Sequence, residues 1–231
     1  MRSIFKWVVI VLALAMGTII GAYFLAKKYE EPVRNYIVGE VNKRLASPVH
    51  VGDINFTLLE RFPSASLVMD SMWAEENIVK MGAPDTLLFF RKVYLNLNLF
   101  DILGGQYKIN EIEARDGFVR LMVDKKGYDN YHIWKQGDGT TGFLLELNKV
   151  HIENGALCYQ NIARQQNIEL VANDLWFTGK FSEDNYTMAV RGDGQVQSFD
   201  LKKTNYLKDR KVAVECDFDI TTSTETYSFK H

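Results

Sequence analysis

Few residues in this sequence have the types and the spacing that catalysis or metal binding requires. Asp217 and Asp219 lie two residues apart, and two carboxylates on one face of a strand could hold a cation. Apolar residues alternate with them, however, which is the pattern of an ordinary solvated strand face. The glycine-rich segment 137–142 lacks the lysine of a phosphate-binding loop, and the four histidines are scattered. We therefore expect no enzymatic activity, no bound metal and no cofactor.

The two cysteines, Cys158 and Cys216, leave two interpretations open. In an oxidising compartment they could form a disulfide. The apolar residues that alternate with Cys216 favour instead a small, buried hydrophobic side chain.

The overall composition is that of a folded protein with little net charge. The 231 residues include 27 Lys and Arg against 29 Asp and Glu, which gives a net charge of −2. Hydrophobic residues make up 47% and charged residues 24%, and these fractions exclude global disorder. A dedicated nucleic-acid-binding protein would carry an excess of basic residues, so we expect no nucleic-acid partner.

The N-terminal segment has the length and composition of a membrane anchor. Residues 7–26 contain 20 consecutive uncharged residues, which in a helix would span about 30 Å, the thickness of a bilayer's hydrocarbon layer. A cleaved signal peptide is the competing interpretation, but it needs small residues at its end, where this segment has Phe24-Leu25-Ala26. We therefore predict a single, uncleaved span within residues 1–28.

The basic residues around this span bear on its orientation. Arg2 and Lys6 precede it and favour a cytoplasmic N-terminus, although Lys27 and Lys28 behind it nearly balance them. We predict that the N-terminus is cytoplasmic and that the body lies on the other side of the membrane.

A short amphipathic segment, residues 29–48, follows the anchor. Val33, Ile37 and Val41 recur at a spacing of four, which places them on one face of a helix. Pro32 can begin such a helix, and Pro48 ends it. The helix could cap the end of a following sheet or lie on the membrane surface.

From Val49 onward apolar and polar residues alternate, as in strands that bury one face. The clearest runs are 93–99, 118–123 and 212–220. Turn signals separate the runs, and no long helical pattern interrupts them. The predicted fold is mainly β: a transmembrane helix and a short amphipathic helix, followed by an elongated, twisted antiparallel sheet. We expect about ten strands in a repeating β-meander that forms an open groove.

Two Asx-Gly pairs predict tight turns. Asp116-Gly117 and Asn154-Gly155 each stand between two apolar runs, and such pairs supply the positive φ angles of a hairpin turn. We expect both to be hairpin tips, and we expect Gly192–Gly194 to be a turn. The segments 112–117 and 150–155 also resemble each other at an offset of 38 residues. That similarity fits either two independent hairpins or a repeated unit of an elongating sheet.

An ordered set of short motifs resembles the N-terminal part of the AsmA-like proteins, in the form common among Bacteroidetes-type bacteria. The set begins with the anchor and covers most of residues 1–160. After the anchor its members are Val41-Asn42 with Leu45, Pro48–Ile54, Arg61–Leu67, Asp85–Leu88, Leu95–Leu103 read as a strand with its Gly104-Gly105, Ile109–Ile112 with Asp116-Gly117, and Asp124–Gly127 with Asn130-Tyr131.

That resemblance implies a location and a role. Residues 49–231 would be an AsmA-like, β-rich domain in the periplasm of a Gram-negative bacterium, tethered to the inner membrane by the single span. The role would lie in outer-membrane and envelope assembly, with envelope-assembly proteins as partners, and relatives are proposed to conduct phospholipid along a groove. AsmA-like proteins are usually much longer, which suggests that the domain is truncated at its C-terminus.

Strands with one apolar face could build such a groove. Acyl chains fill an apolar trough without demanding hydrogen bonds, and each buried CH₂ contributes about 0.8 kcal/mol. The alternative is a closed β-core in a non-catalytic, membrane-anchored scaffold or regulator of outer-membrane protein assembly. Under the groove hypothesis the lipid-contacting residues are Leu95, Leu97, Leu99, Val119, Leu121, Val123, Val212, Val214, Phe218 and Ile220.

Overall fold

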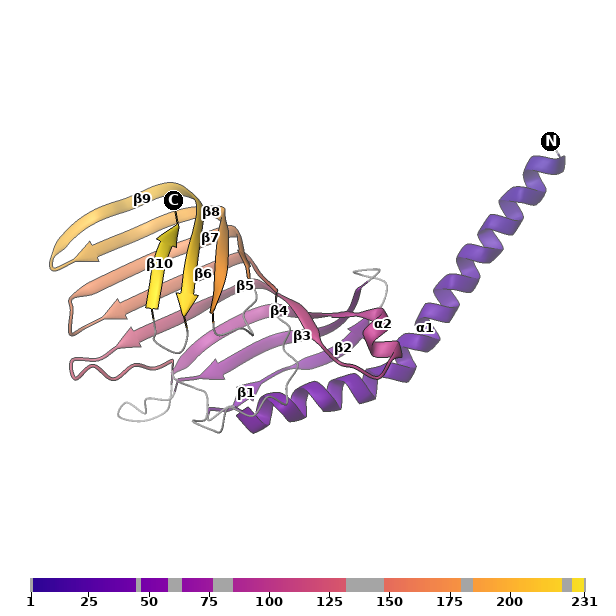
Figure 1. Cartoon of the computed structure of the whole chain (residues 1–231), viewed down its shortest axis with the longest axis horizontal. Coiled ribbons are helices and arrows are strands. Elements are labelled where there is room, and N and C mark those ends of the chain that lie inside the picture. The colour runs from indigo at the N-terminus through magenta and orange to yellow at the C-terminus, as the bar shows by residue number, and fades with distance from the viewer. Residues whose placement is uncertain are drawn as a thin grey trace.

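The chain forms one long helix followed by a single open sheet, with a second, short helix between two strands (Figure 1). The computed structural model describes residues 2–44, 47–57, 64–76, 85–131, 148–179, 185–221 and 226–230. The prediction of a mainly β fold with an N-terminal helix and an open sheet is confirmed.

The helix α1 spans Arg2–Arg44 and contains the anchor and residues 29–44 of the amphipathic segment. We predicted two helices, with the second beginning near Pro32, but Pro32 lies inside one continuous helix. A proline removes only one backbone donor, and the turns on either side are held because Tyr29 and Val33 both pack against the sheet. The large apolar side chains between Trp7 and Leu25 are exposed, and the helix is long and apolar enough to cross a membrane.

Ten strands follow, and most of them are long. β1 and β2 pair side by side with the same edge of β3, so they act as one interrupted edge strand. The bounds are β1 (Val49–His50), β2 (Asp53–Thr57), β3 (Ser64–Glu75), β4 (Thr86–Asn98), β5 (Ile109–Val123), β6 (Lys149–Asn161), β7 (Gln166–Thr178), β8 (Asn185–Leu201), β9 (Thr204–Thr221) and β10 (Thr226–Lys230).

The strand order is β1-β3-β4-β5-β6-β7-β8-β9-β10, with β2 beside β1 on β3. All neighbouring strands are antiparallel except β5 and β6, which are parallel, so the expectation of an antiparallel sheet is wrong at this one pair. Their register joins each residue of β5 to the residue 38 positions later, such as Ile112 to Val150. The internal similarity is therefore two parallel strands lying side by side in register.

The two Asx-Gly pairs lie inside β5 and β6, so the prediction of hairpin tips is wrong. Asp116 and Asn154 do have positive φ, at 53° and 51°, and the register aligns them with Ser71 of β3, at 55°. Arg91 of β4 lies between Ser71 and Asp116. These four residues form what we call the bend line, because a positive φ within a strand interrupts its regular pleat.

The bend line changes which positions face the core. On β4 the core side chains after the bend line lie at odd positions, from Val93 to Leu97. Before the bend line they lie at even positions, Leu88 and Phe90. Beside the line only glycine fits at position 117, since a Cβ there would lie 2.1 Å from the carbonyl oxygen of Phe89. The Asx-Gly pairs thus supply, within the sheet, a residue that adopts a positive φ and a following glycine where a Cβ would not fit.

Two further turn and strand predictions are corrected. Gly192–Gly194 lies within β8 and is not a turn. The alternating run that begins at Val93 ends at Asn98, whose side-chain oxygen accepts a hydrogen bond from the backbone N–H of Phe100 at 2.8 Å. This N-cap starts the helix α2 (Leu99–Leu103), so Leu99 is not a strand residue.

The buried core lies at the N-terminal end of the sheet, where the two helices cover it. Val33 and Ile37 of α1 and Ile102 of α2 are fully buried there. The amphipathic part of α1 therefore packs over this end of the sheet. The core includes buried side chains from β2 to β5 and reaches β6 only through the partly buried Ile152.

Candidate functional site

Rows of apolar side chains cross the sheet from β4 to β9. Residues paired across neighbouring strands point to the same side, so each row can be followed through the registers. One row contains Leu95, Ile112, Val150, Phe177, Val190 and Cys216. A second contains Val93, Ala114, Ile152, Leu175, Gly192 and Val214, and a third contains Leu88, Val119, Leu157, Leu170, Val196 and Arg210.

Burial falls along these rows. Leu97 on β4 is 1% exposed and Leu95 is 6% exposed, because α1 and α2 pack over this end of the sheet. The row members on β6 to β9 are mostly half-buried, and in the part of the chain that the structure describes no cluster of buried residues covers them. We call this surface the open apolar face: it surrounds the buried Val190 and consists of Leu157, Leu170, Leu175, Phe177, Val196, Val212, Val214, Cys216 and Phe218.

The sequence-predicted lipid contacts divide between the core and this face. Leu95 and Leu97 are core residues under the helices, and Leu99 lies in α2 against the same core, so these three do not line an open surface. The physical reason is the docking of α1 and α2, which strand alternation does not encode. Val212, Val214 and Phe218 lie on the open apolar face, whereas the side chain of Ile220 lies outside the described part. Val119, Leu121 and Val123 of β5 lie on the apolar side but not on the open face, since Val119 packs against the core and Leu121 packs against Leu87.

The opposite side of the sheet is polar. Arg191 pairs with Glu215 at 3.1 Å and with Asp217 at 3.0 Å, while Asp219 accepts a hydrogen bond from the Thr187 hydroxyl at 2.7 Å. Glu215 and Asp217 therefore share Arg191, and Asp219 bonds to Thr187, all on the sheet surface, as the solvated-face interpretation requires. Among the described residues, no three His, Cys, Asp or Glu side chains gather as metal ligands, and segment 137–142 lies outside these residues.

A buried polar group on this side was not found by the sequence analysis. Glu113 of β5 is fully buried and bonds to Arg115, which also pairs with Glu153 of β6 at 2.9 Å. His151 is buried beside them, stacks on Trp176 at 3.8 Å between ring centroids and hydrogen-bonds to an Asp174 carboxylate oxygen on β7. The internal similarity could have indicated this contact, because an offset of 38 residues aligns Glu113 with His151, and the two residues are paired in the sheet. These contacts tie β5, β6 and β7 together.

The cysteines are free and lie on opposite sides of the sheet. Cys216 belongs to the apolar rows, opposite Val190, as the hydrophobic interpretation predicted, but it is only half-buried. Cys158 lies opposite Arg120 and Glu169 on the polar side. Burial raises the pKa of the Cys158 thiol, and the nearby Glu169 carboxylate raises it further, so this thiol is a poor nucleophile at neutral pH.

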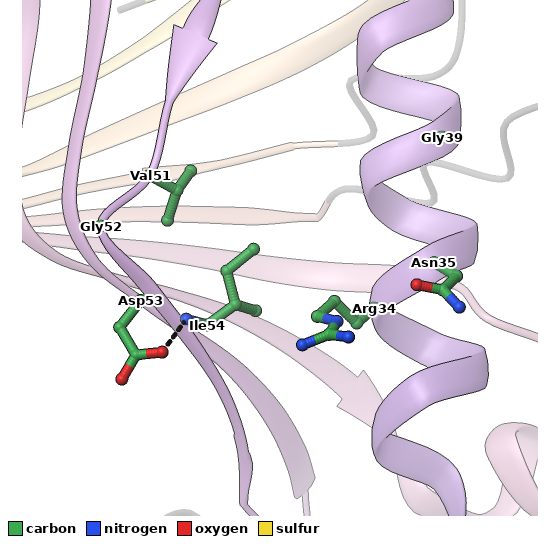
Figure 2. A pocket seen from close by; sticks show the side chains of 7 residues that line it. All are labelled: Arg34, Asn35, Gly39, Val51, Gly52, Asp53 and Ile54. Carbon is green, nitrogen blue, oxygen red and sulfur yellow. Dashed lines mark hydrogen bonds between the residues drawn. The ribbon is translucent and has the colours of Figure 1, made fainter.

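A cleft of ≈ 510 Å³ lies between α1 and the turn that joins β1 to β2 (Figure 2). The Arg34 side chain reaches from α1 towards Ile54, while the Asp53 carboxylate turns back to its own strand and accepts the Ile54 N–H at 2.9 Å. The remaining lining residues are Asn35, Gly39, Val51 and Gly52. Strands β3 to β5 separate this cleft from the open apolar face.

Comparison of the chain with protein-family models, with curated proteins and with solved structures found no match. The candidate site therefore rests on the geometry above. Its main feature is an extended apolar surface on β6 to β9, in a chain whose N-terminal helix can cross a membrane.

Proposed function

We propose that this chain is a membrane-anchored protein that holds phospholipid acyl chains on its open apolar face. The observation that carries the proposal is the half-exposed continuation of the core rows across β6 to β9. An extended apolar surface of this kind is unfavourable in water and marks a binding surface. Acyl chains suit it because methylene groups gain about 0.8 kcal/mol each on burial and need no hydrogen-bond partner.

The surface also favours movement of a lipid tail along the sheet over binding at one fixed position. The three rows described above offer mainly Leu, Val and Phe side chains, and the charged side chain among them is Arg210, at the end of one row. A lipid tail would meet similar contacts at each step and would not be locked by a directional bond. Conduction of acyl chains along the face is therefore part of the proposal.

The resemblance to AsmA-like proteins supplies the proposed setting. The span in α1 would anchor the chain in the inner membrane of a Gram-negative bacterium, with a cytoplasmic N-terminus and the sheet in the periplasm. The protein would then serve outer-membrane and envelope assembly. The second candidate function, a scaffold without lipid, is favoured by one observation: the rows are closed by α1 and α2 over β3 to β5.

Native mass spectrometry of the full chain, released from detergent, tests the lipid proposal. Val214→Glu places a carboxylate on the open apolar face, and Ala213→Glu places the same carboxylate on the adjacent, exposed position of β9. We expect Val214→Glu to retain fewer phospholipids than the wild type and Ala213→Glu to retain as many, with both variants showing the wild-type circular dichroism spectrum. Equal retention by the two variants would contradict the proposal and favour the scaffold.

A further inference from the structure

The turn between β8 and β9, together with the first eight residues of β9, carries a concentration of positive charge that the rest of the chain does not share. We call residues Lys202–Lys211 the distal tip. Five of these ten residues are cationic and one, Asp209, is acidic, which gives 5 − 1 = +4. The whole chain carries −2, so the remaining residues sum to −2 − 4 = −6. The cationic residues are Lys202, Lys203, Lys208, Arg210 and Lys211.

Every residue of the distal tip is exposed, including two large apolar ones. Tyr206 is 59% exposed and Leu207 is 41% exposed. Leu207 pairs with Phe199, which places it at the end of an apolar row that begins with Leu121 and passes through β6 and β7. Cationic side chains around an exposed tyrosine and leucine are the composition of a surface that enters a lipid headgroup layer.

The distal tip is part of an ordered, hydrogen-bonded β-hairpin. Lys202 and Lys203 make the turn with positive φ, and the Lys202 N–H donates to the carbonyl oxygen of Gln165, in the turn between β6 and β7, at 2.8 Å. Within the hairpin, Asn205 donates to the Asp200 carboxylate at 2.7 Å. Hydrogen bonds from Ser198 and Asn205, together with the positive charge of Lys208, hold the pKa of Asp200 below its usual value, so this carboxylate stays ionised and offsets part of the positive charge beside the tip.

The position of the tip is the third observation. The β8–β9 turn lies at one end of the molecule's longest axis, and the N-terminus of α1 lies at the other (Figure 1). A tip that is far from the anchor can meet a surface other than the membrane that α1 crosses.

We propose that the distal tip docks onto an anionic bilayer surface, with the lysines and Arg210 against lipid phosphates and with Tyr206 and Leu207 at the headgroup level. Charge complementarity selects this occupant, because five cations within ten residues match a polyanionic surface. The two apolar side chains suit the lipid headgroup region, which lies between water and the apolar acyl chains. The proposal does not depend on whether acyl chains occupy the open apolar face.

The test uses the full chain in phosphatidylcholine proteoliposomes, mixed with fluorescent vesicles that contain phosphatidylglycerol or phosphatidylcholine alone. Clustering of the two vesicle populations reports docking. Lys202→Gln with Lys203→Gln removes two charges from the tip. The control is Lys125→Gln with Lys126→Gln, a second pair of exposed turn lysines, next to Asp124 and Asp129; they follow the end of β5, which the registers align with the end of β8.

We expect clustering with the anionic vesicles only, about tenfold weaker for the tip variant and within about twofold of wild type for the control, with loss at high salt. Tyr206→Ser with Leu207→Ser should also weaken it. Equal effects of the tip and control variants, or equal clustering with neutral vesicles, would overturn the proposal. In a further control, the proteoliposomes are treated with protease before the fluorescent vesicles are added. If clustering is unchanged in the tip variant but is abolished by this treatment, another part of the chain docks and the proposal is wrong.

Discussion

Asn154 donates a hydrogen bond from Nδ2 to Oδ1 of Asp116 at 3.2 Å, although the two residues are 38 positions apart. Both have positive φ, and both precede a glycine. Since β5 and β6 are parallel and in register, the two similar segments place their bends side by side, and the side chains join them. Arg91 extends the contact to β4 by pairing with the other oxygen of Asp116. Side-chain bonds therefore join three of the four bend-line residues across β4, β5 and β6.

The glycine beside the bend should be irreplaceable. In Gly117→Ala the new Cβ would overlap the Phe89 carbonyl oxygen and the Phe90 ring, so we expect a loss of about 1–3 kcal/mol in the free energy of unfolding. Gly104→Ala is the control, because a Cβ there meets its nearest atom at an ordinary 3.4 Å. Denaturant unfolding of the detergent-solubilised chain measures both, and equal stability of the two variants would be inconsistent with a tight bend.

The Asp116 carboxylate should make the stability of the folded protein depend on pH. The hydrogen bond from Arg91, together with that from Asn154, holds the pKa of Asp116 below its usual value. A lowered pKa in the folded state means that the contribution is present above the unfolded pKa and is lost as the pH falls through the folded pKa. Asp116→Asn tolerates the same backbone and removes the charge.

We therefore expect Asp116→Asn to melt at a lower temperature than the wild type near neutral pH, with the difference shrinking once the pH falls below about 4. Melting curves over this range provide the measurement. A constant difference at every pH would show that the charge of Asp116 does not matter.

The two ends of the apolar rows should respond differently to the same truncation. Leu97→Ala opens a cavity in the closed core and should cost about 2–5 kcal/mol in the free energy of unfolding. Leu170→Ala, on the half-exposed part, should cost about 1 kcal/mol or less, because little enclosed packing is lost. Denaturant midpoints compare the two. A large cost at Leu170 would mean that this face is packed in the folded protein.

A buried amide next to the end of β5 should be needed for stability. Asn130 is 1% exposed, donates from Nδ2 to Glu76 and to the Arg120 carbonyl, each at 3.1 Å, and accepts the Met122 N–H at 2.8 Å. Asn130→Ala leaves these buried groups without that partner and should cost about 2–3 kcal/mol. The exposed Asn173, with one bond to Asp193 at 2.7 Å, is the control and should cost about 0.5 kcal/mol or less as alanine.

The sequence predicts local features of this fold better than its contacts between distant segments. Alternation correctly placed Val212, Val214 and Phe218 on one side of β9, because side-chain direction in a strand is a local property. The Asx-Gly pairs correctly indicated positive φ, but the same backbone angle serves a hairpin turn and a bend within a strand. Only the partner strand distinguishes them, and that partner lies 38 residues away.

The candidate site shows the same division. Leu97 and Val214 have equivalent sequence patterns, yet one is buried under α1 and α2 and the other is half-exposed. The difference arises from where the helices dock, which is a tertiary property. The buried pair of Glu113 and His151 likewise depends on the parallel register of β5 and β6.

Photocrosslinking with a phospholipid that carries a diazirine in its acyl chain tests the central claim most directly. The reagent would be added to the full chain in detergent, and the adducts would be mapped by mass spectrometry of peptides. We expect adducts on the open apolar face, at residues such as Leu170, Val196 and Val214, in addition to those on the exposed part of α1. Adducts confined to α1, or found equally on the polar side at Ala213 and Glu215, would contradict the claim that the face on β6 to β9 holds acyl chains.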